Sequence, residues 1–228
     1  TTIDDDEAAT LDINATSTLA EGGGAQSSGV VTLTITGSGT GAGFQLGAGI
    51  SLTADVTDAT GGSATDTTDF GSVGTQTLTF DSNAATASTQ SATLTPVDDQ
   101  RVEGDETINL ALGNLVAAST DASIGNAANV TTITDDDTAS ITFDAATSNP
   151  SEGGTSSTAG LTLTVTPNGA VGTPGLDVAV SVDVNETSAT ATEGALGSGD
   201  YEYTDTNIMF SPFNGTTTAT DSVTITLH

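Results

Sequence analysis

Alternation at a period of two is the feature that most restricts what this chain can fold into. Apolar or β-branched residues alternate with polar ones in VVTLTIT (30–36), TINLAL (107–112), LTLTVT (161–166) and SVTITL (222–227). This period places alternate side chains on opposite faces of a strand, and Thr, Val and Ile favour strands. Gly, Asn and Asp cluster between such stretches, and no stretch shows a capped helical period. The pattern predicts an all-β fold of immunoglobulin-like antiparallel β-sandwiches.

The chain also repeats itself. The matched segments are TTI (1–3) with TTI (131–133), AEGGG (20–24) with SEGGT (151–155), VTLTIT (31–36) with LTLTVT (161–166), and TLTF (77–80) with NIMF (207–210). The first match is a shift of 130 residues (131 − 1), which corresponds to a whole domain rather than to one turn of a solenoid.

The repeat predicts three parts. Residues 1–7 are the tail of a preceding repeat, residues 8–137 form a complete sandwich, and residues 138–228 form a second sandwich that lacks its last two strands. The second sandwich is therefore expected to have an open sheet edge, which is a site for strand pairing.

Charge excludes several kinds of partner. The sequence has 30 acidic residues and a single Lys or Arg, Arg101, for a formal net charge of −29. Nucleic acids and anionic membrane surfaces are poor partners, because phosphate binding needs Lys and Arg. A compact chain of this charge repels itself, so bound cations or high salt must offset the repulsion. A solvated acidic surface adapted to salt is an equal alternative for the acids that are scattered along the strands.

Missing residue types exclude several chemistries. The sequence has no Cys and no Lys, and its single His is His228. Disulfides, thiol chemistry, Cys-ligated zinc and Schiff bases are therefore excluded, and we predict no catalytic residues. No apolar run reaches the ~20 residues of a membrane helix, so membrane insertion is not expected. If the protein is exported, we expect its signal to lie outside this segment.

Acids cluster where predicted strands end. VDDQRVEGDETINL (97–110) holds five acids in nine residues, around Arg101, which we expect to pair with its acidic neighbours. Asp135–Asp137 follow a predicted strand, Glu21 precedes a Gly run, and Asp69 precedes Phe70. Loops distant in sequence converge at the two ends of a sandwich. Carboxylates gathered in this way would raise one another's pKa and destabilise the fold unless a cation binds them.

The residue types favour calcium among the cations. Ca²⁺ accepts roughly 6–8 oxygen ligands from flexible carboxylates, whereas Mg²⁺ needs a small octahedral cage. Transition metals normally recruit His or Cys. The spacing fits neither an EF-hand nor a nonapeptide β-roll. Paired carboxylates also occur in glycosidases, but two Tyr and no Trp offer little platform for a sugar.

Several of these segments together resemble tandem Calx-beta domains, the β-sandwich module of the sodium–calcium exchanger's regulatory loop and of many large extracellular proteins. They are SEGG, SAT…DF, SAT…GDY, TLTF, VDDQRVEGDETINLAL and VTTITDDD. The resemblance covers nearly the whole chain and implies that Ca²⁺ binds at one end of the sandwich. Asp135–Asp137 has a simpler alternative reading as the end of a strand in a solvated linker.

The resemblance implies metal ligands in both copies. Those of the first copy are Glu21, Asp69, Asp98, Asp99, Glu103, Glu106, Asp135, Asp136 and Asp137, and those of the second are Glu152 and Asp200. The internal repeat assigns Asp4, Asp5, Asp6 and Glu7 to a half-site of the preceding repeat.

We therefore predict a non-enzymatic, calcium-binding structural module of a secreted or cell-surface repeat protein. Its role would be adhesion, a stalk, or a fibre or sheath subunit, with Ca²⁺ stiffening the junctions between domains. A calcium-sensing regulatory module and an accessory module of a larger secreted carbohydrate-active protein are the alternatives. The expected partners are neighbouring repeats of the same chain, with other copies joined by strand addition as a further option.

Overall fold

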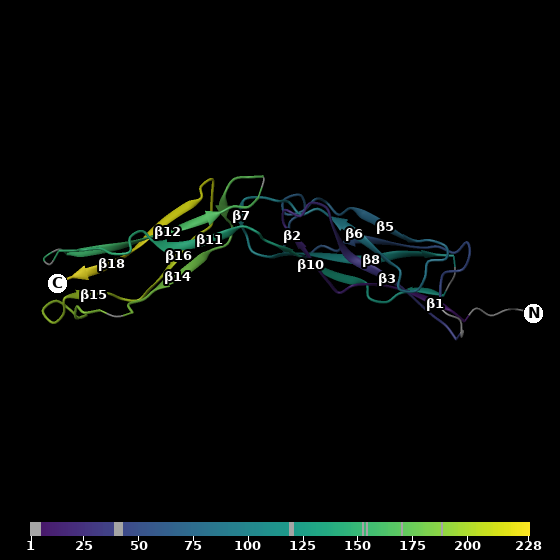
Figure 1. Cartoon of the computed structure of the whole chain (residues 1–228), viewed down its shortest axis with the longest axis horizontal. Coiled ribbons are helices and arrows are strands. Elements are labelled where there is room, and N and C mark those ends of the chain that lie inside the picture. Colours follow the sequence, from purple (N-terminus) through teal and green to yellow (C-terminus); the bar gives the residue numbers. More distant parts are fainter. Residues whose placement is uncertain are drawn as a thin grey trace, which may run out of the picture. The chain divides into compact units, whose positions relative to one another are not determined.

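The computed structural model describes residues 6–38, 43–118, 121–151, 153, 155–169, 171–187 and 189–228 (Figure 1). Within these ranges all regular secondary structure is β-strand, which confirms the prediction of an all-β fold. Among the described residues, no helix is long and apolar enough to cross a membrane.

The chain divides into two compact units. Unit 1 comprises Thr1–Asp98 and Asp105–Asp135, and unit 2 comprises Asp99–Gly104 and Asp136–His228. The chain therefore enters unit 2 for a short segment, returns to unit 1, and leaves it again after Asp135. The repeat pattern alone assigns Asp99–Gly104 to the first copy, so this excursion is a feature of the tertiary structure.

Unit 1 is a sandwich of two sheets. The first sheet has the order β6 (Thr89–Leu94), β3 (Gln26–Thr36), β1 (Ala8–Ile13) and β9 (Ala122–Ile124). The second has the order β2 (Thr16–Ala20), β10 (Ala128–Thr134), β8 (Glu106–Ala117), β4 (Leu52–Asp58) and β5 (Thr75–Phe80).

Most neighbouring strands of unit 1 are antiparallel, as predicted, but β1 pairs with β9 and β2 pairs with β10 in parallel. The reason is a change of sheet by the first stretch of chain. It leaves the first sheet after Ile13 and joins the second at Thr16, continuing in the same direction.

The core of unit 1 follows the period of two. In β1 the buried residues are Ala9, Leu11 and Ile13, while the residues between them are partly exposed. The buried side chains of β8 are Ile108, Leu110 and Leu112, each at most 4% exposed. Burial of one such Leu or Ile side chain contributes roughly 1.5–3 kcal/mol, so this alternation is the main source of stability.

A buried polar network joins the two sheets where the chain changes sheet. The Thr131 hydroxyl of β10 donates to Asn129 Oδ1 at 2.6 Å and lies 2.6 Å from the Ser28 hydroxyl of β3. Asn129 Nδ2 in turn donates to the Asn14 carbonyl at 2.8 Å and to Ser17 Oγ at 3.1 Å. Ser28, Asn129 and Thr131 are at most 1% exposed, so these bonds satisfy groups that water does not reach.

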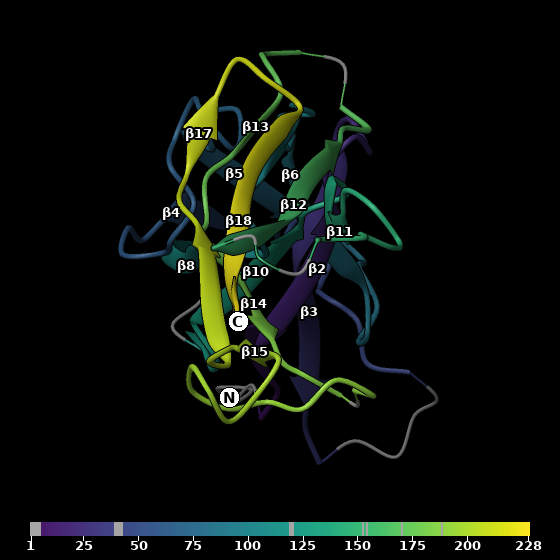
Figure 2. The ribbon, with the colours of Figure 1, turned by 90° about the vertical axis from the view of Figure 1, so that its left-hand side faces the viewer.

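Unit 2 has a four-stranded sheet and two smaller ones. The large sheet has the order β11 (Thr138–Phe143), β12 (Ser156–Thr166), β18 (Thr218–Leu227) and β15 (Tyr201–Glu202), and its long strands lie side by side in Figure 2. The others are β17 (Phe213–Asn214), β13 (Gly175–Leu176) and β7 (Arg101–Val102), and the pair β14 (Val180–Val184) and β16 (Thr206–Phe210). Its core holds Leu161, Leu163, Val165, Leu176, Val184, Ile208, Phe210 and Val223.

The two units share a common plan. Strand β11 pairs with β12 as β1 pairs with β3, and β14 pairs with β16 as β4 pairs with β5. Among the described residues of unit 2, no strand takes the places of β8 and β10. The repeat pattern predicts that residues 138–228 lack the two strands that correspond to these.

Candidate metal centre

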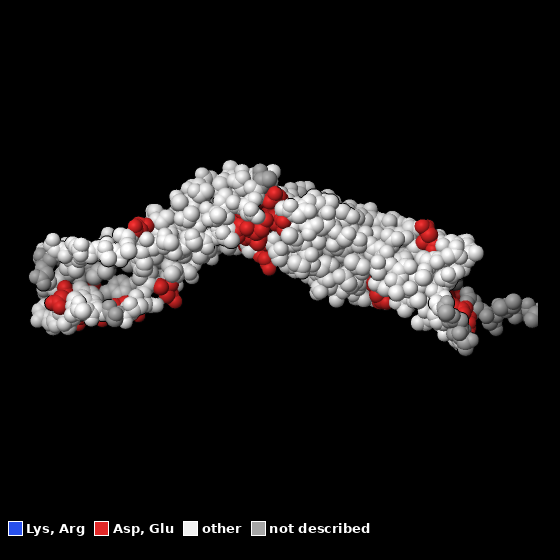
Figure 3. Space-filling model, in the orientation of Figure 1, with Lys and Arg blue, Asp and Glu red and all other residues white. Residues whose placement is uncertain are grey.

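The acidic side chains are unevenly distributed. In the space-filling view, the strand faces of both units show few Asp or Glu side chains, and no Lys or Arg is visible on this face (Figure 3). Along the part of the chain that the structure describes, most Asp and Glu residues lie in loops or at strand ends.

Three of the predicted ligands come together. Asp69, Glu103 and Glu106 each offer a carboxylate oxygen, and these three oxygens lie within 4.8 Å of one another. Calcium binds its oxygens at about 2.3–2.6 Å, so two ligands of one ion lie up to roughly 5 Å apart. The spacing of the three-carboxylate group therefore suits a bound cation.

Local structure sets the positions of these side chains. Glu106 is the first residue of β8, and Glu103 lies three residues before it on the same segment. Asp69 precedes Phe70, which is 1% exposed and anchors the loop between β4 and β5 in the core. A strand end and an anchored loop thus present the carboxylates.

Asp69 also holds its own loop. Its Oδ2 accepts a hydrogen bond from the Thr65 amide at 2.5 Å, and its amide donates to the Thr65 carbonyl at 3.0 Å. The Asp69 carbonyl accepts from the Val97 amide at 2.9 Å. A cation at Asp69 would therefore share this carboxylate with the loop that positions it.

Asp200 makes the same loop in the second copy. Its Oδ2 accepts from the Thr192 amide at 2.8 Å, and its amide donates to the Thr192 carbonyl at 2.7 Å. The side chain is exposed and belongs to no group of three carboxylates among the described residues. The second predicted ligand of this copy, Glu152, lies outside the described residues.

A second set of predicted ligands is held within unit 2. Asp136 Oδ2 accepts from Asn168 Nδ2 at 2.8 Å, and Asp137 Oδ1 accepts from the Asn168 amide at 2.5 Å. Asp137 is only 6% exposed. The second oxygen of Asp136, Oδ1, is buried and has no hydrogen-bond partner among the described residues. A buried, unpaired carboxylate oxygen is costly, and a cation is the kind of group that would satisfy it.

Asn168 and Gly169 were not among the predicted site residues. A Cβ atom on Gly169 would lie 0.9 Å from the Asp99 carbonyl oxygen, so only glycine lets this turn and the Asp99 backbone approach each other. The dipeptide Asn-Gly after Pro167 is a recognisable turn signal. Nothing in the sequence, however, shows that this turn meets Asp99, Asp136 and Asp137.

Asp99, whose backbone lies against Gly169, also contacts Arg101. Asp99 Oδ1 accepts from the Arg101 amide at 2.8 Å. The Arg101 guanidinium donates through Nε to Asp177 Oδ2 at 2.5 Å and through Nη2 to Asp177 Oδ1. The two hydrogen bonds from Arg101 lower the pKa of Asp177. Arg101 thus binds an aspartate 76 residues away in sequence, and the negative charges of Asp99 and Glu103 also raise the pKa of Arg101.

The remaining first-copy ligands lie in unit 1. Glu21 is 8% exposed, and its amide donates to the Thr134 carbonyl at 3.1 Å, which places it beside the end of β10. Asp135 follows that strand directly, and Asp98 follows the Val97 that binds the Asp69 loop. Asp98 and Asp135 are both half-buried.

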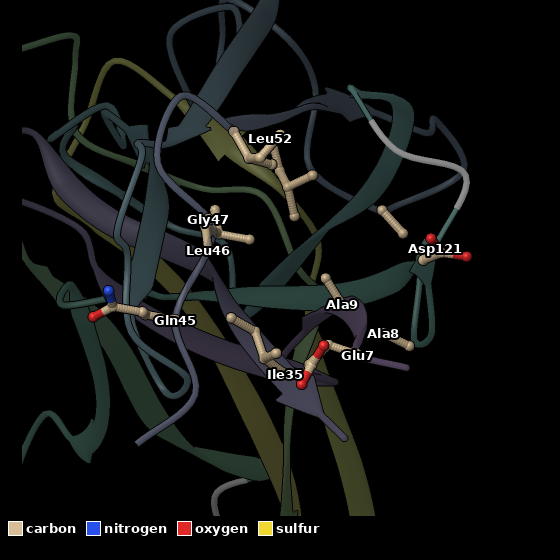
Figure 4. A pocket seen from close by; sticks show the side chains of 11 residues that line it. Glu7, Ala8, Ala9, Ile35, Gln45, Leu46, Gly47, Leu52 and Asp121 are labelled. Atoms are coloured by element: carbon tan, nitrogen blue, oxygen red, sulfur yellow. The ribbon is translucent and has the colours of Figure 1, made fainter. Parts of the chain in front are cut away.

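The half-site expected at the start of the chain is only partly described. Asp4 and Asp5 lie outside the described residues, and Asp6 accepts a hydrogen bond from the Ser38 hydroxyl. Glu7 lines a cavity of about 140 Å³ in unit 1, and Figure 4 shows it with Ile35 and Leu46 among the lining side chains. Most of that lining is apolar, so this cavity does not resemble a metal site.

Comparisons with known proteins found similarity to solved structures. No protein-family model and no curated protein matches the sequence. It is similar to the crystal structure of CBD12 from CALX1.2, with 17% identity, a TM-score of 0.41, and coverage of 96% of this chain and 75% of that chain. It is also similar to the apo-form Calx CBD1 domain, with 18% identity, a TM-score of 0.39, and coverage of 57% of this chain and 98% of that chain. For the calcium binding domain CBD12 of CALX1.1 the identity is 17%, the TM-score 0.38, and the coverage 96% and 76%. All three structures are described as domains of Calx.

Proposed function

We propose that this chain is a calcium-binding structural module, in which Asp69, Glu103 and Glu106 form the centre of a Ca²⁺ site. The observation that carries the proposal is the convergence of their three carboxylate oxygens within 4.8 Å. Ca²⁺ is the cation that these ligands favour, because it binds hard oxygen donors with flexible geometry. Zinc and copper sites normally include His or Cys, and the sequence has no Cys and one His.

The ligands of unit 2 support the same proposal. Asp136 and Asp137 are held by Asn168 through hydrogen bonds of 2.8 and 2.5 Å, so their carboxylates are already positioned. The buried and unpaired Asp136 Oδ1 is the kind of atom that a cation satisfies. The stoichiometry of calcium binding shows whether these ligands hold a cation of their own.

The proposed role of the metal is to stiffen the chain. Glu103 lies between β7 and β8, and Glu106 is the first residue of β8. A cation bound to both side chains would restrict Gly104 and Asp105, the two residues between them. It would also offset repulsion in a chain of net charge −29.

We further propose that the module acts outside the cell, in a secreted or surface-displayed repeat protein, without catalytic activity. Ca²⁺ at millimolar concentration fills even a weak site, with a dissociation constant near ~10⁻⁴ M. Adhesion, a stalk and a fibre or sheath subunit are the roles that a calcium-stiffened array would serve. The absence of Cys and of Lys leaves this segment without thiol or Schiff-base chemistry.

Isothermal titration calorimetry with CaCl₂ tests the site, using Asp69→Asn and Asp200→Asn as a matched pair. Both aspartates close the same loop with a threonine amide, but only Asp69 belongs to the three-carboxylate group. An Asn side-chain oxygen can still accept the loop hydrogen bond, so both variants should fold. We expect Asp69→Asn to lower the calcium affinity about tenfold or more and Asp200→Asn to leave it unchanged.

The same titration separates the alternatives. A dissociation constant near ~10⁻⁴ M or weaker agrees with a structural module, whereas a value near ~10⁻⁶ M would favour the calcium-sensing alternative. No heat of binding at millimolar calcium, or equal effects of the two variants, would refute the proposed site.

A further inference from the structure

Strand β14 of unit 2 has a neighbour on one side only. It pairs with β16 so that Val180 lies opposite Phe210, just as Leu52 of β4 lies opposite Phe80 of β5. Strand β4, however, also pairs with β8 along its other edge. Among the described residues nothing pairs with that edge of β14, so its backbone donors and acceptors are available to an added strand.

Unit 2 is also hollow beside this edge. A cavity of about 250 Å³ is lined by Ile141, Phe143, Leu161, Val182 and Val184, among others. A second cavity of about 170 Å³ lies against Phe143 and Val184 as well and is lined mainly by apolar groups. Figure 3 shows the opening in unit 2 between its two layers. An apolar cavity of roughly 150 Å³ already accommodates a ligand such as benzene, so this space has room for apolar side chains.

The exposure of matched residues shows that a covering layer belongs here. Phe143 lies opposite Leu161 in β12 as Ile13 lies opposite Val31 in β3, so the two occupy the same place in the repeat. Ile13 is 1% exposed, whereas Phe143 is 55% exposed. In unit 1, Ile13 and Leu110 of β8 both lie against Gly29. Phe143 thus lacks the neighbour that β8 provides to Ile13.

Unit 1 also shows what would cover this surface. Strand β8 lies antiparallel to β4, with Leu112 opposite Val56, and buries Ile108, Leu110 and Leu112 in the core. The required segment is therefore extended, with an apolar residue at every second position.

Charge further restricts the added segment. Asp55 of β4 accepts hydrogen bonds from Thr77 of β5 at 2.6 Å and from Asn114 of β8 at 2.6 Å. Its counterpart in β14, Asp183, accepts from Asn207 of β16 at 2.6 Å, which takes the place of Thr77. No described residue of unit 2 takes the place of Asn114. The added segment should therefore carry an amide, hydroxyl or basic donor at this position and no acid.

We propose that the free edge of β14 and the cavity beside it form a strand-acceptor site. Its ligand is an extended polypeptide segment with the pattern of β8: alternate apolar residues that enter the cavity, and a hydrogen-bond donor that meets Asp183. Backbone pairing supplies the affinity and the alternate side chains supply the specificity. The site is separate from the calcium proposal, because none of the proposed calcium ligands lines either cavity.

The test uses the full chain and a synthetic peptide with the sequence of residues 106–117, ETINLALGNLVA. We expect saturable 1:1 binding and at least tenfold slower amide hydrogen exchange in Val180–Val184, measured by mass spectrometry, with no change in Leu52–Asp58. A peptide with Leu110→Asp and Leu112→Asp should not bind, because its charged side chains would enter the apolar cavity. A peptide with Asn114→Asp should bind at least tenfold more weakly because of repulsion by Asp183.

Two further peptides separate strand pairing from general hydrophobic adsorption. One is N-methylated at the even-numbered residues and the other at the odd-numbered residues. Only one of these two sets of amides faces β14, so one peptide should bind and the other should not. Equal behaviour of the two N-methylated peptides, protection outside Val180–Val184, or no binding of the parent peptide would each overturn the proposal.

Discussion

Replacement of Thr131 by valine tests the buried network that joins the two sheets of unit 1. The Thr131 hydroxyl donates to Asn129 Oδ1, so its contact with Ser28 must be a hydrogen bond that Ser28 donates. Valine keeps the shape of the side chain but removes both bonds. Asn129 Oδ1 and the Ser28 hydroxyl are then left without their partner in a region that is at most 1% exposed.

The size of the effect can be derived from these contacts. Each buried polar group that loses its partner costs about 1–3 kcal/mol, so two groups cost about 2–6 kcal/mol. Burial of a methyl group in place of a hydroxyl returns about 1 kcal/mol. We therefore expect Thr131→Val to lower the free energy of unfolding by about 1–5 kcal/mol. Unit 1 has 129 residues (98 + 31), so the melting temperature should fall by about 3–20 °C.

A double-mutant cycle in urea, followed by far-UV circular dichroism, checks the assignment. Ser28→Ala removes the other hydroxyl, and the double variant Ser28→Ala with Thr131→Val no longer contains an unpaired Ser28. Its destabilisation should be smaller than the sum of the two single variants by about 1 kcal/mol or more. Strict additivity, or a loss below about 0.5 kcal/mol for Thr131→Val, would refute the network as described. Because β10 leads directly to Asp135, calcium titration of the folded variant also shows whether the network positions that ligand.

Three other predictions follow from unit 2 and the acidic ligands. Arg101→Met should lower the free energy of unfolding by about 1 kcal/mol at pH 7, since the ion pair with Asp177 is partly exposed. Arg101 lowers the pKa of Asp177, so the pair stabilises the fold above about pH 4 and no longer does so once the pH falls below the lowered pKa. In urea unfolding, the difference in unfolding free energy between the parent and Arg101→Met should therefore be smaller at pH 2.5 than at pH 7. Gly169→Ala should displace the Asp99 backbone and increase hydrogen exchange of residues 99–104. Gly113→Ala, where a Cβ meets nothing within 4 Å, should not affect that segment. With a dissociation constant of ~10⁻⁴ M, 10 mM CaCl₂ should stabilise the protein by about 2.7 kcal/mol. A thermal melt that stays unchanged when CaCl₂ is removed with EDTA, or replaced by NaCl of equal ionic strength, would contradict the calcium proposal.

Much of the fold could be predicted from the alternation of residue types. The stretches TINLAL and LTLTVT lie within β8 and β12, and their apolar residues are buried as the period requires. The exchange of sheet between β1 and β2, with its two parallel pairs, was not predicted. The alternation of residue types indicates which face of a strand is apolar, but it does not indicate which sheet the strand joins.

The candidate site was predictable to a similar degree. The motifs indicate Asp69, Glu103 and Glu106 among a larger set of acids, and only the structure brings these three together. They do not indicate Asn168, which binds Asp136 and Asp137, because a hydrogen bond between residues more than 30 positions apart depends on the path of the chain. For the same reason the Arg101 guanidinium binds Asp177, whereas the sequence predicts a pair with its acidic neighbours; its backbone amide does bind the neighbouring Asp99.

The sequence by itself determined the all-β fold and the internal repeat, and it limited the candidate metal ligands to oxygen donors, because each follows from residue type and spacing along the chain. The tertiary structure decided which acids converge, that Asp99–Gly104 joins unit 2, and that the edge of β14 lacks a neighbouring strand among the described residues. The physical reason is that strand pairing and loop convergence are contacts between distant residues. They depend on how whole sheets close over the core, which local propensity does not specify.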